Sequence, residues 1–175
     1  DGVLLHAGDA SIRIAGAARA NGPSDLRIEI DRVELATIQT LTGTTSPRDQ
    51  ERVTGVLAGA ATLSGTLAAP QITADARLAH LTIAGVRYAS ASAHVEATAT
   101  RASTSARLEQ TAGRALTLDA ASPVDLSLSP FRFRATGDLG GRLAADRIDL
   151  AFVGALTSAV AEVRGVLAAD VAIGG

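Results

Sequence analysis

Apolar and polar residues alternate along most of this chain, and this period of two limits the folds that it can adopt. Leu26, Ile28 and Ile30 alternate with Arg27 and Glu29, and similar segments recur until the last residues. Successive side chains of a β-strand point to opposite faces, so each segment predicts a strand with one apolar face. One-faced strands favour antiparallel pairing. Turn signals about every 8 to 12 residues predict an all-β meander of roughly a dozen short strands.

The period of two is interrupted at defined places. After Arg32 the apolar parity shifts by one residue, and a second shift precedes Leu81. A shift would turn the following side chains to the other face unless a bulge or tight turn corrects it. We therefore predict such a correction near Asp31 and Arg32. The sequence predicts at most one short helix, over Leu35–Leu41.

Prolines punctuate the second half of the chain. Ser122–Pro123 and Pro130 predict that the region after Gly113 divides into three separate strands. These strands carry, in order, Leu116 and Leu118, then Val124, Leu126 and Leu128, then Phe131 and Phe133. A later strand is predicted to carry Ile148, Leu150 and Phe152.

One glycine-rich strand has a partial copy of itself near the end of the sequence. Val53–Ile72 reads VTGVLAGAATLSGTLAAPQI, and Val163–Gly175 reads VRGVLAADVAIGG. Glycines within a strand weaken it and let the sheet bend, so we predict a curved, strongly twisted sheet. The copy predicts that residues 1–175 form a single β-trough segment, an interior fragment of a longer repetitive protein whose repeat restarts at about residue 163.

Composition excludes several classes of function. All 16 basic residues are arginine, the formal net charge is −2 and aromatic residues make up 2% of the chain, so nothing indicates a nucleic-acid surface. The absence of cysteine excludes disulfides, thiolate metal sites and a cysteine nucleophile. The three histidines lack ligand spacing. We therefore predict no metal, no cofactor, no catalytic residue and no enzymatic activity.

Three phrases resemble a known family. Gly55–Ile72, GVLAGAATLSGTLAAPQI, resembles the recurring phrase of TamB-like proteins in the AsmA-like, bridge-like lipid-transfer group. Val33–Gly43, VELATIQTLTG, is similar to the strand and short helix that precede that phrase. Ala121–Leu128, ASPVDLSL, is similar to a downstream segment. The alanine richness and the absence of lysine depart from familiar members.

The resemblance implies a long antiparallel sheet curled into a taco-like trough with a hydrophobic inner face. It implies a periplasmic location, with the parent protein anchored in the bacterial inner membrane. The expected function is non-enzymatic passage of phospholipid between inner and outer membrane, with a second expected role in outer-membrane protein assembly and secretion. The expected partners are phospholipid acyl chains and an outer-membrane β-barrel protein of the Omp85 type.

Elementary packing supports a groove independently. A sheet with one apolar face must cover it with a second sheet, by curling, or with a ligand. Much of the apolar content is alanine, which fills little volume, so acyl chains would suit the remaining space. The groove-lining residues predicted from the pattern are Leu26, Ile28, Ile30, Leu57, Leu63, Ile72, Leu78, Val95, Leu116, Leu118, Val124, Leu126, Leu128, Phe131, Phe133, Ile148, Leu150 and Phe152.

Two other readings of the same pattern stay open at this point. A closed β-sandwich or barrel would make the chain a structural or adhesive repeat of a surface protein, with a sealed core and no ligand. Alternatively, an open edge strand, here Val163–Ile173, would pair with an unfolded outer-membrane strand in the manner of a chaperone.

Overall fold

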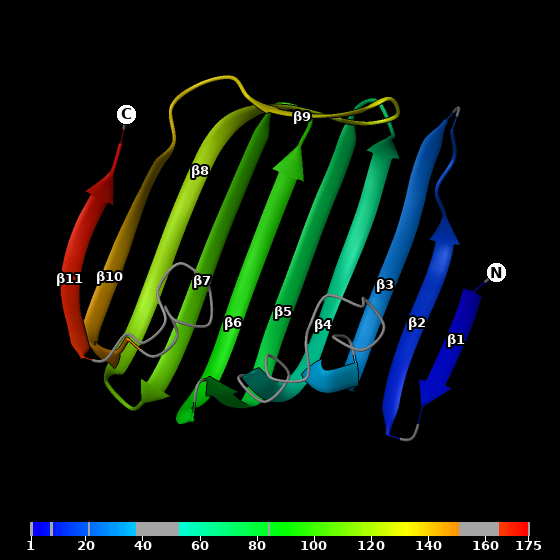
Figure 1. Cartoon of the computed structure of the whole chain (residues 1–175). Coiled ribbons are helices and arrows are strands. Elements are labelled where there is room, and N and C mark those ends of the chain that lie inside the picture. The colour runs from blue at the N-terminus through cyan, green and yellow to red at the C-terminus, as the bar shows by residue number, and fades with distance from the viewer. Residues whose placement is uncertain are drawn as a thin grey trace.

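The computed structural model describes residues 2–7, 9–20, 22–37, 53–83, 85–150 and 165–174. These residues form one antiparallel sheet of eleven strands that does not close into a barrel (Figure 1). The all-β, curled, open architecture confirms the predicted fold class. The strands are β1 (Gly2–Ala7), β2 (Ala10–Ala17), β3 (Pro23–Glu34), β4 (Val53–Thr66), β5 (Pro70–Ile83), β6 (Val86–Thr98), β7 (Arg101–Thr111), β8 (Arg114–Leu128), β9 (Phe131–Ala135), β10 (Gly140–Asp149) and β11 (Val166–Ile173).

The strands follow chain order across the sheet. The path runs from β1 to β8 and then to β10 and β11, while β9 lies off the path and pairs with β8. Every pairing is antiparallel, so neighbouring strands alternate in direction. Of the helix predicted over Leu35–Leu41, the described part is one helical turn at residues 35–37, and the remainder lies outside the described residues.

Strand register gathers the apolar side chains on one face, which we call the inner face. Ile28 on β3 pairs with Ala61 on β4, Ala61 with Ala74 on β5, and Ala74 with Val95 on β6. Because directly opposed residues of neighbouring strands share a face, the apolar parity continues from strand to strand. The opposite face, the outer face, carries the alternating charged and polar residues.

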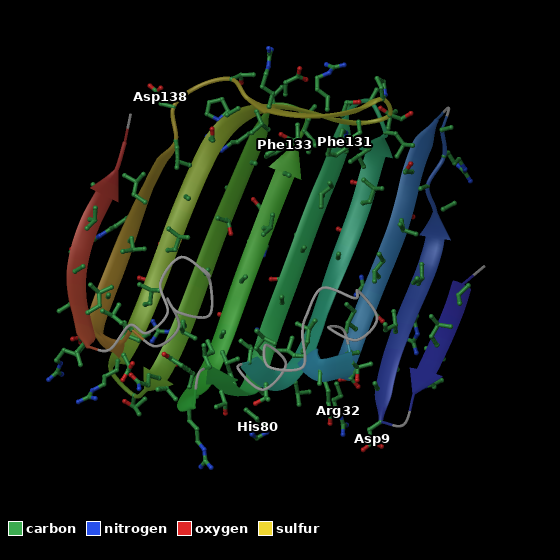
Figure 2. All side chains as sticks on the ribbon, in the orientation of Figure 1. Asp9, Arg32, His80, Phe131, Phe133 and Asp138 are labelled. Atoms are coloured by element: carbon green, nitrogen blue, oxygen red, sulfur yellow. The ribbon has the colours of Figure 1, made fainter. Side chains whose placement is uncertain are left out.

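Three bulges correct the parity shifts. Arg32, His80 and Arg147 are the non-glycine residues with left-handed backbone among those described, with φ of 52°, 52° and 46°. Each is followed by an apolar residue that is almost fully buried: Val33 at 4%, Leu81 at 3% and Ile148 at 0% exposure. The left-handed residue therefore returns the strand to the inner face. This confirms the bulge predicted at Asp31–Arg32. Figure 2 shows Arg32 and His80 on the same rim of the sheet, which we call the bulge rim.

The structure extends the internal repeat from one strand to two. β3 with the residue after it ends in IDRVEL, and β10 with the residue after it ends in ADRIDL, with left-handed arginine at the same place. The pairings also correspond: Val33 opposes Leu57, and Ile148 opposes Leu167, each after the same register shift. The hairpin units β3–β4 and β10–β11 therefore share sequence, bulge and register.

The prediction of three strands between Leu116 and Ala135 was wrong, because Ser122–Pro123 does not interrupt β8. On one side Pro123 opposes Arg101 of β7. On the other side pairing with β10 ends at Ala121 and pairing with β9 begins at Val124. A proline, which lacks an N–H group, is tolerated where it interrupts no ladder hydrogen bond.

Beyond Pro123, β8 turns across the ends of its neighbours. The N–H groups of Val124 and Leu126 donate to the carbonyls of Thr100 and Ala99 at 3.0 and 2.9 Å, and that of Leu128 donates to Leu67 at 2.7 Å. The β8–β9 hairpin thus lies crosswise over the strand ends opposite the bulge rim (Figure 1). We call residues Val124–Ala135 the cap hairpin.

The last predicted strand is also shifted. β10 spans Gly140–Asp149, so Ile148 lies near its end and Leu150 in the turn after it. The Leu150 N–H donates to the Gly165 carbonyl at 3.0 Å. Phe152 lies outside the described residues.

The left-handed backbone at Arg32 predicts an unusual response to glycine. We expect Arg32→Gly to raise the free energy of unfolding by about 0.5–1 kcal/mol, because glycine adopts this conformation without the Cβ conflict. Arg27→Gly, on the same strand but with ordinary β conformation, should lower it by about 0.5–1 kcal/mol. Urea denaturation of both variants measures the difference, and equal signs would contradict the bulge.

Candidate functional site

The inner face carries most of the predicted groove residues. Leu26 pairs with Leu63 and Leu63 with Ile72, while Leu57 pairs with Leu78. These side chains are half-buried, whereas Val95 is 37% exposed. Ten predicted residues therefore share one continuous surface across β3 to β8: Leu26, Ile28, Ile30, Leu57, Leu63, Ile72, Leu78, Val95, Leu116 and Leu118.

An apolar hollow of about 540 Å³ lies on this surface. Its volume falls within the range of ordinary ligand pockets. Ala76, Ala93 and Ala106 line it and oppose one another in one register row across β5, β6 and β7. Small side chains in this row leave space that larger ones would fill. Its remaining lining residues are Val53, Leu78, Leu81, Ile83, Ala91, Ser92, Arg107, Leu108, Leu116, Leu118 and Leu143.

A packed cluster closes the hollow toward the bulge rim. Leu81, Tyr88, Ala145 and Ile148 are buried together there. The Tyr88 hydroxyl donates to the Asp149 carbonyl at 3.1 Å, although β7 and β8 separate β6 from β10 in the sheet. This bond therefore joins strands that the curled sheet brings together. Ile148, predicted to line the groove, is instead a fully buried member of this cluster.

A second bridge supports the same end of the sheet. The Asp149 N–H donates to the Gln110 side-chain oxygen at 3.0 Å. Gln110 lies at the register irregularity between Glu109 and Thr111, near the end of β7. The backbone carbonyl and N–H of Asp149 thus bind the side chains of Tyr88 on β6 and Gln110 on β7, and neither strand is adjacent to β10.

The cap hairpin holds five further predicted residues away from the hollow. Val124 and Leu126 are 5% and 6% exposed, and Leu128 is half-buried. Phe131 and Phe133 pair with Leu128 and Leu126 but are 77% and 62% exposed. Figure 2 shows both phenylalanines at the cap hairpin, at the strand ends opposite the bulge rim. Sequence reasoning therefore grouped two separate surfaces into one site.

The outer face has a larger hollow, of about 680 Å³, whose lining mixes small apolar residues with charged ones such as His94, Asp119 and Arg142. His94 Nδ1 lies 2.8 Å from Asp75 Oδ1, and His94 Nε2 lies 3.4 Å from Glu96 Oε1. These hydrogen bonds, the one to Asp75 foremost, raise the pKa of the His94 imidazole. Arg142 pairs with Asp170 on the same face, and this hydrogen bond lowers the pKa of the Asp170 carboxyl. Opposite charges thus pair along a solvated surface.

The described residues contain no group of three or more histidine, aspartate or glutamate side chains placed to hold a metal ion. In the same part of the chain, no helix has the length and apolar character needed to cross a membrane. Comparison with protein-family models, curated proteins and solved structures finds no match for this chain.

Sequence reasoning missed most of the hollow. Of its lining residues, only Leu78, Leu116 and Leu118 were predicted. Leu81 and Ile83 follow the second parity shift, which was visible in the sequence, and a bulge there would have placed them on the inner face. The alanine row was missed because which alanines oppose one another depends on register, and strand periodicity alone does not give register.

Tyr88 provides a test of the closed end. We expect Tyr88→Phe to lower the free energy of unfolding by about 1 kcal/mol, because it removes the hydrogen bond to Asp149 and keeps the ring. Tyr88→Ala should cost about 3–5 kcal/mol, because it also leaves a cavity beside Leu81 and Ile148. Chemical denaturation measures both values, and a Tyr88→Phe variant as stable as the parent would contradict the role of the hydroxyl.

Proposed function

We propose that this chain is a non-enzymatic lipid-carrying module that holds phospholipid acyl chains in the apolar trough. The observation that carries the proposal is the 540 Å³ hollow on the inner face of an open sheet. Among the described residues, neither a second sheet nor bulky side chains fill this part of the apolar face, and a ligand is a suitable cover for it.

The chemistry of the lining favours hydrocarbon over a polar ligand. Its side chains are aliphatic except at Ser92 and Arg107. These two residues oppose each other and belong to the polar, outer-face positions of β6 and β7. An acyl chain needs no directional partner, and its burial contributes about 0.8 kcal/mol per CH₂. A carbohydrate or nucleotide would leave its hydroxyl and phosphate groups without hydrogen-bond partners, which costs free energy.

The shape of the site suggests how a lipid would lie. The alanine row crosses the strands of the sheet, so an acyl chain along it would follow the long axis of the trough. The cluster at the bulge rim limits the hollow on one side. Charged headgroups would then remain at the margin of the trough, where water solvates them.

The family resemblance supports a cell-envelope setting for this proposal. The TamB-like phrase at Gly55–Ile72 lies in β4 and β5, strands that contribute to the trough, and the phrase at Ala121–Leu128 lies where β8 turns into the cap hairpin. On this proposal the parent protein is anchored in the bacterial inner membrane, the trough lies in the periplasm, and lipid passes between inner and outer membrane. An outer-membrane β-barrel protein of the Omp85 type is the proposed receiving partner, which would extend the role to outer-membrane protein assembly.

The alternative, a structural or adhesive repeat with a sealed core, makes the opposite prediction for the inner face. It requires a dry interior between opposing sheets. The described strands form one open sheet, and only eight hydrophobic residues among them are buried. These features favour the ligand-binding groove.

Filling the hollow should weaken lipid binding. We expect Ala106→Leu to weaken the binding of a fluorescent phospholipid several-fold, because the added side chain occupies the alanine row. Ser105→Leu is the matched control, since it adds the same side chain to the neighbouring outer-face position. Titration of each purified variant with the labelled lipid measures the change. Failure of the parent protein to bind the lipid, or equal loss in both variants, would overturn the proposal.

A further inference from the structure

Exposed apolar side chains gather on the side of the sheet that carries the cap hairpin. Outside β1 and β11, the exposed large hydrophobic residues of the described part of the chain are Val95, Phe131, Phe133 and Leu139. Val95 lies one inner-face position beyond Ala93, toward the end of β6 that meets the cap hairpin. Leu139 directly precedes β10, which begins opposite Ala121. Exposed hydrophobic residues that gather in one place mark a binding surface.

The cap hairpin holds its two phenylalanines on an extension of the inner face. Phe133 opposes Leu126, which keeps the parity of Leu118 along β8. Directly opposed residues share a face, so both phenylalanines continue the apolar face onto β9. Arg132 and Arg134 alternate with them and therefore belong to the opposite face.

The packing of the hairpin does not use these phenylalanines. All five residues of β9 are exposed, whereas Val124 and Leu126 of β8 are buried where the hairpin meets the strand ends. The backbone of the hairpin is thus anchored while its two phenyl rings stay in water. Contact with an apolar ligand would remove the rings from water, which is favourable.

The volume of the hollow indicates which ligand group this is. At roughly 30 Å³ for each methylene group, about the share of liquid volume that one water molecule takes, the 540 Å³ hollow holds about 18 of them. That is the size of one acyl chain of a membrane phospholipid. A phospholipid carries two acyl chains, so the second chain needs an apolar surface outside the hollow.

The cap hairpin runs in the direction that a second chain requires. Its backbone binds the carbonyls of Thr100, Ala99 and Leu67, so it crosses the ends of several strands (Figure 1). The alanine row also crosses the strands, at Ala93 on β6. One chain in the hollow and one along the hairpin would therefore lie side by side along the trough, with Val95 on the inner face between them.

We propose that Phe131 and Phe133 bind the second acyl chain of the phospholipid whose first chain occupies the hollow. This inference rests on the proposed function and adds a second acyl-chain site to it. Val95 completes the apolar path from the alanine row to the hairpin. The cap hairpin therefore distinguishes lipids with two acyl chains from lipids with one.

Two lipids with the same headgroup test this assignment. The probes are a phosphatidylcholine and the lysophosphatidylcholine that lacks one of its acyl chains. The double variant Phe131→Ser, Phe133→Ser should bind the two-chain lipid several-fold more weakly and the one-chain lipid as the parent does. Ala106→Leu should weaken both, because it fills the hollow. Arg134→Ser, on the opposite face of β9, is the matched control and should change neither affinity.

Tryptophan fluorescence tests the contact itself, because the chain contains no tryptophan. Phe133→Trp places an indole on the apolar face of β9, and Arg134→Trp places one on the opposite face. A phosphatidylcholine with brominated acyl chains should quench the first indole and leave the second unchanged. Thermal unfolding of all variants should match the parent, because the replaced side chains are exposed.

Four results would overturn the proposal while leaving lipid binding in the hollow intact. They are unchanged binding of the two-chain lipid by the double variant, equal loss for both lipids, equal quenching of both indoles, and dimerisation of the parent that depends on the two phenylalanines. The last would assign the patch to a second copy of the chain. A parent protein that binds neither lipid would overturn the proposed function and this inference together.

Discussion

A one-layer sheet must cover its apolar face, and the rest of this structure depends on that requirement. Curling alone brings β6 and β10 close enough for Tyr88 to reach Asp149. The bulges then supply large buried side chains along the bulge rim, because each left-handed residue directs the next aliphatic side chain inward. The cap hairpin covers the strand ends on the other side. The middle of the face is left with small side chains and a hollow.

In this arrangement, one set of residues stabilises the sheet and another set determines the volume of the hollow. Leu81, Tyr88 and Ile148 bury large apolar surfaces and hold the rim together. Ala76, Ala93 and Ala106 bury little area, so they contribute little to stability, but they determine the space that is available. Larger residues in that row would give a better-packed sheet and a smaller groove. Because this row holds alanine and no large side chain, the groove stays open there.

The sequence was sufficient to predict the all-β class, the antiparallel pairing and the bulge at Arg32, because all three follow from a period of two and its interruption. The period of two left a closed sandwich or barrel open, and the curled trough was implied by the family resemblance. Pro123 misled the prediction, since whether a proline breaks a strand depends on which neighbour it faces, and that neighbour is distant in sequence. Ile148 and Phe131 were both assigned to the groove from their parity alone. One is buried in the rim and the other exposed on the cap hairpin, because curvature and the turn of β8 place them there.

The two repeated hairpins have a consequence for how such a chain can lengthen. Along the sheet, β10 stands six places after β3, an even number. Strand direction alternates with every step, so only an even displacement returns a strand to the same orientation with its aliphatic side chains on the same surface. Duplication of an odd number of strands would invert the added unit and interrupt the trough. Gene duplication in this architecture is therefore restricted to whole hairpins, which lets a trough grow in length while its cross-section stays the same.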